Sequence, residues 1–143
     1  MRAATAALPG DPDDVTLVVR ATELLHAYGT PAHRLERVVV NLAESRGLPV
    51  EVFSTPTSIF LGFGAEVTDR VRLLRVEPGG VDLGRLVDLD ELLDEVSAGA
   101  LTPSVALERL DAAPVRRPVV GSPGVLGAQV APPDRVAVLR RVE

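Results

Sequence analysis

The chain has 143 residues, a formal net charge of −5 and no cysteine, so it has the size of one ordinary domain. Without cysteine it has no disulfide framework, thiol nucleophile or thiolate metal site, and without lysine it has no lysine Schiff base. An acidic chain that is only 3% aromatic lacks the basic patch and stacking rings of nucleic-acid-binding proteins, so no nucleic-acid partner is expected.

Residues 1–12 are rich in Ala, Pro and Gly and are expected to form a flexible leader. A first helix is predicted from Asp13 or Asp14 to Tyr28, because apolar residues recur there at helical spacing, and Gly29 is its expected stop. The very short link that follows favours two helices packed side by side.

A second helix is predicted between Pro31 and Gly47. Thr30 is the expected N-cap, and Pro31 suits the first helical position because its missing N–H costs nothing there. Gly47 suits a left-handed conformation after the last turn. One apolar stripe is expected to face the core: Leu35, Val38, Val39, Leu42 and Ala43.

After Gly47 the pattern becomes extended, and three strands are predicted over about 50–53, 59–63 and 70–76. Pro56 must interrupt the ladder between the first two strands or lie at an edge. The connections are short, so the three strands are predicted to form an antiparallel meander.

Two further helices are predicted in the second half. Asp82 caps one that runs to Gly99, and a Thr-Pro pair at 102–103 opens a shorter one that runs through Leu110 and could reach Ala113. The order ααβββαα predicts an α+β fold in two layers, with a three-stranded antiparallel meander packed on helices.

The domain is predicted to span residues 13–113. Residues 114–143 are dense in Pro and Gly and show no sustained period, so they are expected to form a largely disordered tail. A short helix or strand is expected within 135–142.

His33 and Glu36 lie three residues apart on the second helix, and His26 ends the first helix nearby. Two histidines and a carboxylate can bind a divalent ion in principle, but the His-Glu-x-x-His motif is absent. Neither a metal nor another cofactor is therefore expected.

Thr55, Thr57 and Ser58 lie in the turn after the first strand. Their hydroxyls could bind a small polar ligand, or Ser58 or Thr57 could be the nucleophile of a small hydrolase that uses His33 and Glu36. No Gly-x-Ser-x-Gly elbow is present, and turn hydroxyls commonly bond their own backbone. The sequence therefore favours a protein that is not an enzyme.

Arg70, Arg72 and Arg75 place guanidinium groups on or beside the third strand, where they could bind a carboxylate or a phosphate. The alternative is exposed ion pairing with acidic residues across the sheet. The acidic residues between 88 and 95 lie mostly opposite the leucine stripe of their helix and are expected to form a solvated face.

Taken together, these segments resemble the N-terminal soluble domain of the threonine/serine exporter family over roughly residues 15 to 113. The segments that carry the resemblance are GTPAHRLE in the second helix, Gly47-Leu48 before a strand, TPTS after it, the Arg-rich third strand, Val81-Asp82-Leu83 with Leu86, and residues 99–110.

The resemblance implies a cytoplasmic domain that precedes transmembrane helices exporting small hydroxy amino acids, and a hydrolase-like role is suggested for such domains. By position, the residues that match the family's patterns are Gly29, Arg34, Glu36, Thr55, Pro56, Thr57, Arg70 and Arg75. Where the family enters the membrane, this chain has its Arg- and Pro-rich tail, so a truncated or free-standing version of the domain is expected.

Three functions stay open. The favoured one is a regulatory or ligand-binding domain of amino-acid export, not a transporter by itself. It would lie in the cytoplasm, bind a small hydroxy amino acid and act beside a membrane transport subunit. The others are the small hydrolase and a protein-interaction module. The sequence leaves the oligomeric state open.

Overall fold

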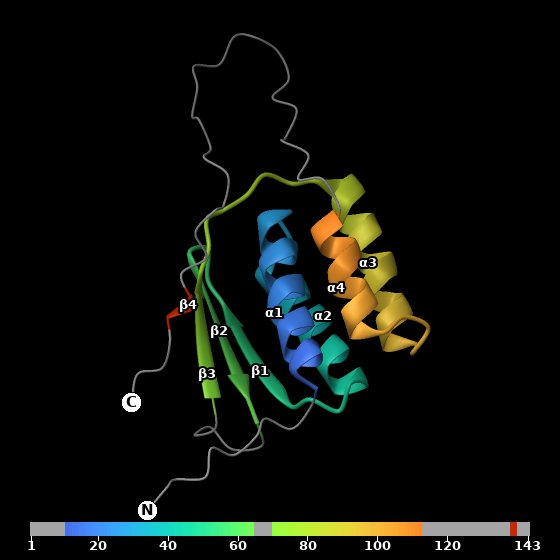
Figure 1. The fold of residues 1–143 in the computed structure, drawn as a ribbon. Coiled ribbons are helices and arrows are strands. Elements are labelled where there is room, and N and C mark those ends of the chain that lie inside the picture. Colours follow the sequence, from blue (N-terminus) through green and yellow to red (C-terminus); the bar gives the residue numbers. More distant parts are fainter. Residues whose placement is uncertain (1–10, 65–69, 113–137, 140–143) are drawn as a thin grey trace, which may run out of the picture.

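The computed structural model describes residues 11–64, 70–112 and 138–139. Within them, four helices and four strands follow one another (Figure 1). The predicted order of two helices, three strands and two helices is confirmed, and so is the α+β class. The elements are α1 (Pro12–Ala27), α2 (Ala32–Ser45), β1 (Val50–Ser54), β2 (Ser58–Phe63), β3 (Arg70–Arg75), α3 (Leu83–Ser97), α4 (Pro103–Ala112) and β4 (Val138–Leu139).

The strands form one antiparallel sheet in the order β1, β2, β3, β4. The first three make the predicted meander, in which Phe60 lies opposite Phe53 on one side and opposite Leu73 on the other. β4 adds a short strand beside β3 and falls within 135–142, where a short helix or strand is expected. Residues 1–10 of the predicted leader and most of the predicted tail lie outside the described residues.

The described helices lie on one side of the sheet and are stacked two deep (Figure 1). α1 and α2 lie next to the sheet, and α3 and α4 lie beyond them. The side of the sheet that faces the helices, here called the inner face, carries the buried residues Ile59, Leu61 and Phe63 of β2. The opposite side is the outer face.

α1 is covered on two sides, by the sheet and by the outer pair of helices (Figure 1). Leu17, Val18, Ala21 and Leu25 are all 0% exposed. Even Asp14 is buried, and its Oδ1 accepts a hydrogen bond of 2.7 Å from Arg46 Nε at the end of α2. An ion pair thus joins the start of α1 to the end of α2.

Glycines and one aspartate end and begin the helices where the sequence predicts. Gly29, Gly47 and Gly99 follow α1, α2 and α3 with φ of 81°, 67° and 76°, the left-handed conformation that glycine adopts without a steric penalty. Asp82 caps α3, because its side chain accepts the Arg85 N–H at 3.1 Å.

The predicted N-cap role of Thr30 is wrong. The N-cap of α2 is Pro31, and no side chain caps this end. Thr30 instead completes the end of α1, since its N–H donates to the Leu25 carbonyl at 3.0 Å beyond the left-handed Gly29. The C-terminal motif of α1 therefore uses Thr30, the residue that was expected to cap α2.

Glu23 on α1 is a largely buried carboxylate whose Oε2 lies 3.4 Å from Arg20 Nη1. Burial raises the pKa of Glu23 above its ordinary value, and the attraction of Arg20 opposes only part of this shift. The folded chain therefore holds this proton more tightly than the unfolded chain. Consequently, the free energy of unfolding falls as the pH rises through the pKa of Glu23.

We expect Glu23→Gln to remove this dependence. As the pH rises from about 4 to 7, the free energy of unfolding of E23Q should therefore increase relative to that of the wild type. Urea denaturation across this range measures the difference. Glu44→Gln, at an exposed position on α2, is the control and should follow the wild-type curve. Parallel curves for E23Q and the wild type would contradict the raised pKa.

Candidate functional site

The turn between β1 and β2 contains Thr55, Pro56 and Thr57. Thr55 Oγ1 donates to the Ser58 carbonyl at 2.9 Å and accepts the Ser58 N–H at 3.0 Å, while the Thr55 N–H donates to the same carbonyl at 2.8 Å. The carbonyl of Thr57 accepts the Val76 N–H at 3.1 Å. The Thr55 hydroxyl is thus used by its own turn, and the turn is tied to the end of β3.

Glu36 reaches the same region from α2. Its Oε1 accepts the backbone N–H of Ser54, the last residue of β1, at 2.9 Å. β1 is the end strand of the described sheet, and an unpaired N–H on such a strand is open to other chains. The Glu36 carboxylate therefore covers one backbone donor at this edge and fastens α2 to β1.

Ser58 and His33 lie on different sides of the sheet. Ile59 is on the inner face, so the alternation of β2 turns the Ser58 side chain to the outer face. α2, which carries an exposed His33, lies on the inner side (Figure 1). The Ser58 hydroxyl and the His33 imidazole are therefore on opposite sides of the sheet. Within the same residues, no three His, Asp or Glu side chains gather where a metal could bind.

The remaining residues that match the family pattern are dispersed. Arg70 pairs with Phe63 at the start of β3 and Arg75 with Ser58 at its end, so these two arginines point to opposite faces. Gly29 packs against the segment before α3, where an added Cβ would lie 3.0 Å from Val81 Cα. Arg70 and Arg75 therefore do not share a face of the sheet, and Gly29 lies at the end of α1.

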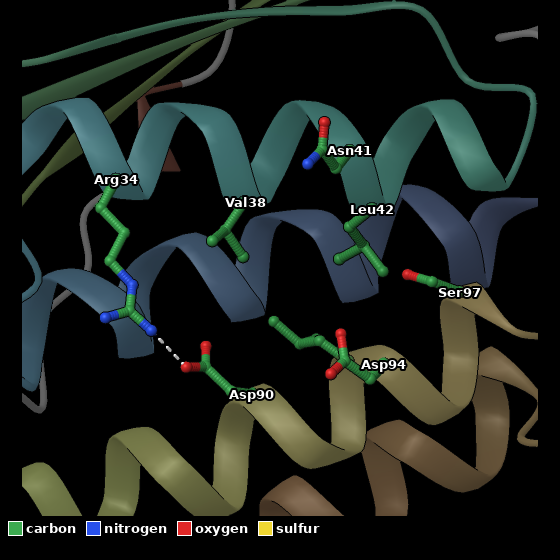
Figure 2. Close-up of a pocket in the computed structure, with 8 residues that line it drawn as sticks. Arg34, Val38, Asn41, Leu42, Asp90, Asp94 and Ser97 are labelled. Carbon is green, nitrogen blue, oxygen red and sulfur yellow. Dashed lines mark hydrogen bonds and ion pairs between the residues drawn. The ribbon is translucent and has the colours of Figure 1, made fainter.

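Arg34 lines a cleft between α2 and α3 (Figure 2). The cleft has a volume of about 260 Å³. Arg34 Nη2 lies 2.5 Å from Asp90 Oδ2, and the two side chains remain 48% and 32% exposed. Four residues of each helix line the cleft at helical spacing: Arg34, Val38, Asn41 and Leu42 from α2, and Asp90, Leu93, Asp94 and Ser97 from α3.

The cleft combines both charges with an apolar wall. Arg34 supplies a guanidinium, and Asp90 and Asp94 supply two carboxylates. The side chains of Val38 and Leu42 lie between the ion pair and the far end, where Ser97 is found (Figure 2). Such a lining suits a small molecule that carries a positive group, a negative group and a short apolar part.

Sequence reasoning finds Arg34 but misses its partners on α3. Asp90 and Asp94 are expected on a solvated face, whereas Asp90 pairs with Arg34 and both line the cleft. The available signal is the spacing of Asp90, Leu93, Asp94 and Ser97 at i, i+3, i+4 and i+7, which places them on one side of α3. Nothing local indicates that α2 lies opposite.

A comparison with protein families finds that the model of the ThrE family of threonine/serine exporters matches residues 16–121, which include both helices of the cleft. No curated protein and no solved structure gives a match. In the described part of the chain, no helix has the length and apolar character needed to cross a membrane.

Proposed function

The chain belongs to the threonine/serine exporter family, and we propose that its α2–α3 cleft binds a small hydroxy amino acid in the context of amino-acid export. The observation that carries the proposal is the Arg34–Asp90 pair at one end of a cleft that also contains Asp94. An α-amino acid carries a carboxylate and an ammonium group, and this lining offers a partner to each.

Exchange of the ion pair makes room for the ligand. An exposed pair between an arginine and a carboxylate is worth about 1 kcal/mol or less, so Asp90 can give up Arg34 at small cost. The ligand carboxylate then accepts two parallel N–H hydrogen bonds from the Arg34 guanidinium. Asp90 and Asp94 accept hydrogen bonds from the ligand ammonium group.

The remaining lining suits a short hydroxylated side chain. Asn41 and Ser97 are hydrogen-bonding partners for a hydroxyl, and Val38, Leu42 and Leu93 offer contacts to a methyl group. The volume of about 260 Å³ lies below the roughly 300–1,000 Å³ of pockets for drug-sized ligands. Threonine and serine match this chemistry and size. We further propose that the domain senses this ligand on the cytoplasmic side, beside a membrane-spanning transport unit.

Threonine or serine at millimolar concentration is expected to raise the melting temperature. A ligand that binds only the folded state adds about 2.7 kcal/mol to the free energy of unfolding when its concentration is 100 times its Kd. Valine, which has the shape of threonine but lacks the hydroxyl, should give a much smaller shift. Scanning fluorimetry and titration calorimetry measure both. No shift with threonine or serine contradicts binding, and an equal shift with valine contradicts recognition of the hydroxyl.

Asp94→Asn is expected to weaken threonine binding about tenfold or more, since hydrogen bonds to charged groups contribute about 1.5 to 3 kcal/mol. Asp88→Asn changes the same residue type on the exposed part of α3 outside the cleft and should bind like the wild type. Equal affinities of D94N and the wild type would show that the ligand binds elsewhere.

A further inference from the structure

The outer face of the sheet is apolar at its centre and is not covered by the described helices, which lie on the inner side (Figure 1). Phe53 is 61% exposed, Phe60 40% and Val71 55%. The register places Phe53, Phe60 and Leu73 in one row across β1, β2 and β3. These four residues are called the outer-face patch below.

Two of the four aromatic residues of the chain lie on this patch. The sequence has three Phe, one Tyr and no Trp, and two of the three Phe belong to the patch. Their ring centroids are 6.2 Å apart with a tilt of 47°, so the rings pack on each other. Aromatic residues are enriched in protein interfaces, and contiguous exposed apolar surface marks sites of association.

Two opposite charges lie at diagonal corners of the same face. Glu51 belongs to the outer-face row with Gly62 and Val71, on one side of the patch row. Arg75 belongs to the row of Ser58, on the other side, and it lies on β3 whereas Glu51 lies on β1. Both side chains are exposed, and neither forms an ion pair with any described residue.

A two-fold axis can give both Glu51 and Arg75 a partner of opposite charge in a second copy of the chain. If two outer faces pack with their strands crossing near 90°, about an axis that runs through Phe60 in the plane between the sheets, Phe60 meets its own copy. The same rotation lays Glu51 of each chain against Arg75 of the other. The two ion pairs then frame a centre made of both outer-face patches.

We propose that the outer face of the sheet is the interface of a homodimer, with the outer-face patches at its centre and two Glu51–Arg75 pairs at its rim. A second copy of the chain suits this face because one surface carries the apolar centre together with both charges that the rotation requires. This interface is separate from the α2–α3 cleft and does not require the ligand proposed there.

Sedimentation equilibrium of the full 143-residue chain between about 1 and 500 μM tests the proposal, and a monomer–dimer equilibrium is expected. Phe60→Glu should weaken the dimer about tenfold or more, because it places two like charges at the dimer centre. Val87→Glu, at a 55% exposed position on α3, should leave it unchanged. A wild type that stays monomeric throughout, or equal dimer constants for F60E and the wild type, overturns the proposal.

The charge pairs allow a test that a structural defect cannot mimic. Glu51→Arg alone and Arg75→Glu alone should each weaken the dimer, because each homodimer then sets like charges against each other twice. A mixture of E51R with R75E should restore it, since both rim contacts then unite opposite charges. Melting temperatures near that of the wild type verify that the variants are folded. A mixture no tighter than either variant alone overturns the proposed arrangement.

Discussion

Leu17→Ala is expected to lower the free energy of unfolding by about 3 to 5 kcal/mol, the upper part of the range for leucine truncation in a core. Leu17 is 0% exposed and belongs to α1, which lies between the sheet and the outer pair of helices (Figure 1). Packed elements on both sides limit how far the surroundings can collapse into the space left by the side chain. Urea denaturation followed by circular dichroism measures the loss.

Leu83→Ala is the matched control for Leu17→Ala. Leu83 begins α3 and is 70% exposed, so the same truncation should change the free energy of unfolding by no more than about 0.5 kcal/mol. Similar losses for the two variants would contradict the central position of α1.

The local features of the fold are predictable from the sequence because they depend on a few neighbouring residues. Gly29 and Gly47 end helices through a backbone conformation that glycine adopts freely, and Asp82 begins one through its side-chain oxygen. The change from helical spacing to alternation after Gly47 locates the meander in the same way. The N-cap prediction for Thr30 is wrong because Thr30 could either complete the C-terminal motif of α1 or cap α2, and the sequence pattern does not show which of the two forms.

The position of α1 is not predictable from its own sequence. Its residues Val15, Val18 and Val19 add buried surface around the helix, but periodicity does not say whether one or two partners cover them. Only the tertiary arrangement, with a second pair of helices beyond the first, explains why both sides of α1 are apolar.

The candidate cleft depends even more on tertiary contacts. Arg34 and Asp90 are separated by 56 positions, and each taken alone resembles an ordinary charge on an exposed helix surface. Glu36 is the opposite case. Its sequence position suggests a functional carboxylate, whereas in the structure it accepts a hydrogen bond from the backbone N–H of Ser54. Sequence patterns identify which side chains can do chemistry, while the packing of α2 on α3 and β1 decides which of them meet.

Gly79→Ala is expected to lower the free energy of unfolding by about 3 kcal/mol, at the upper end of the usual cost of overpacking. A Cβ at Gly79 would lie 2.8 Å from the carbonyl carbon of Ala27 and closer still to its oxygen. These are backbone atoms at the end of α1, so no side-chain rotation can make room. The segment before α3 would have to move, although it is held there by the Asp82 N–H, which donates to the Tyr28 carbonyl at 3.2 Å.

Gly80→Ala separates this close approach from a general effect of replacing glycine. A Cβ at Gly80 meets no atom within 4 Å, and the residue does not have a left-handed φ. Alanine there should leave the free energy of unfolding unchanged or raise it by up to about 1 kcal/mol, because it reduces the freedom of the unfolded chain. Thermal and urea denaturation of both variants measure the contrast. If G79A were as stable as G80A, the segment before α3 would not pass so close to the end of α1.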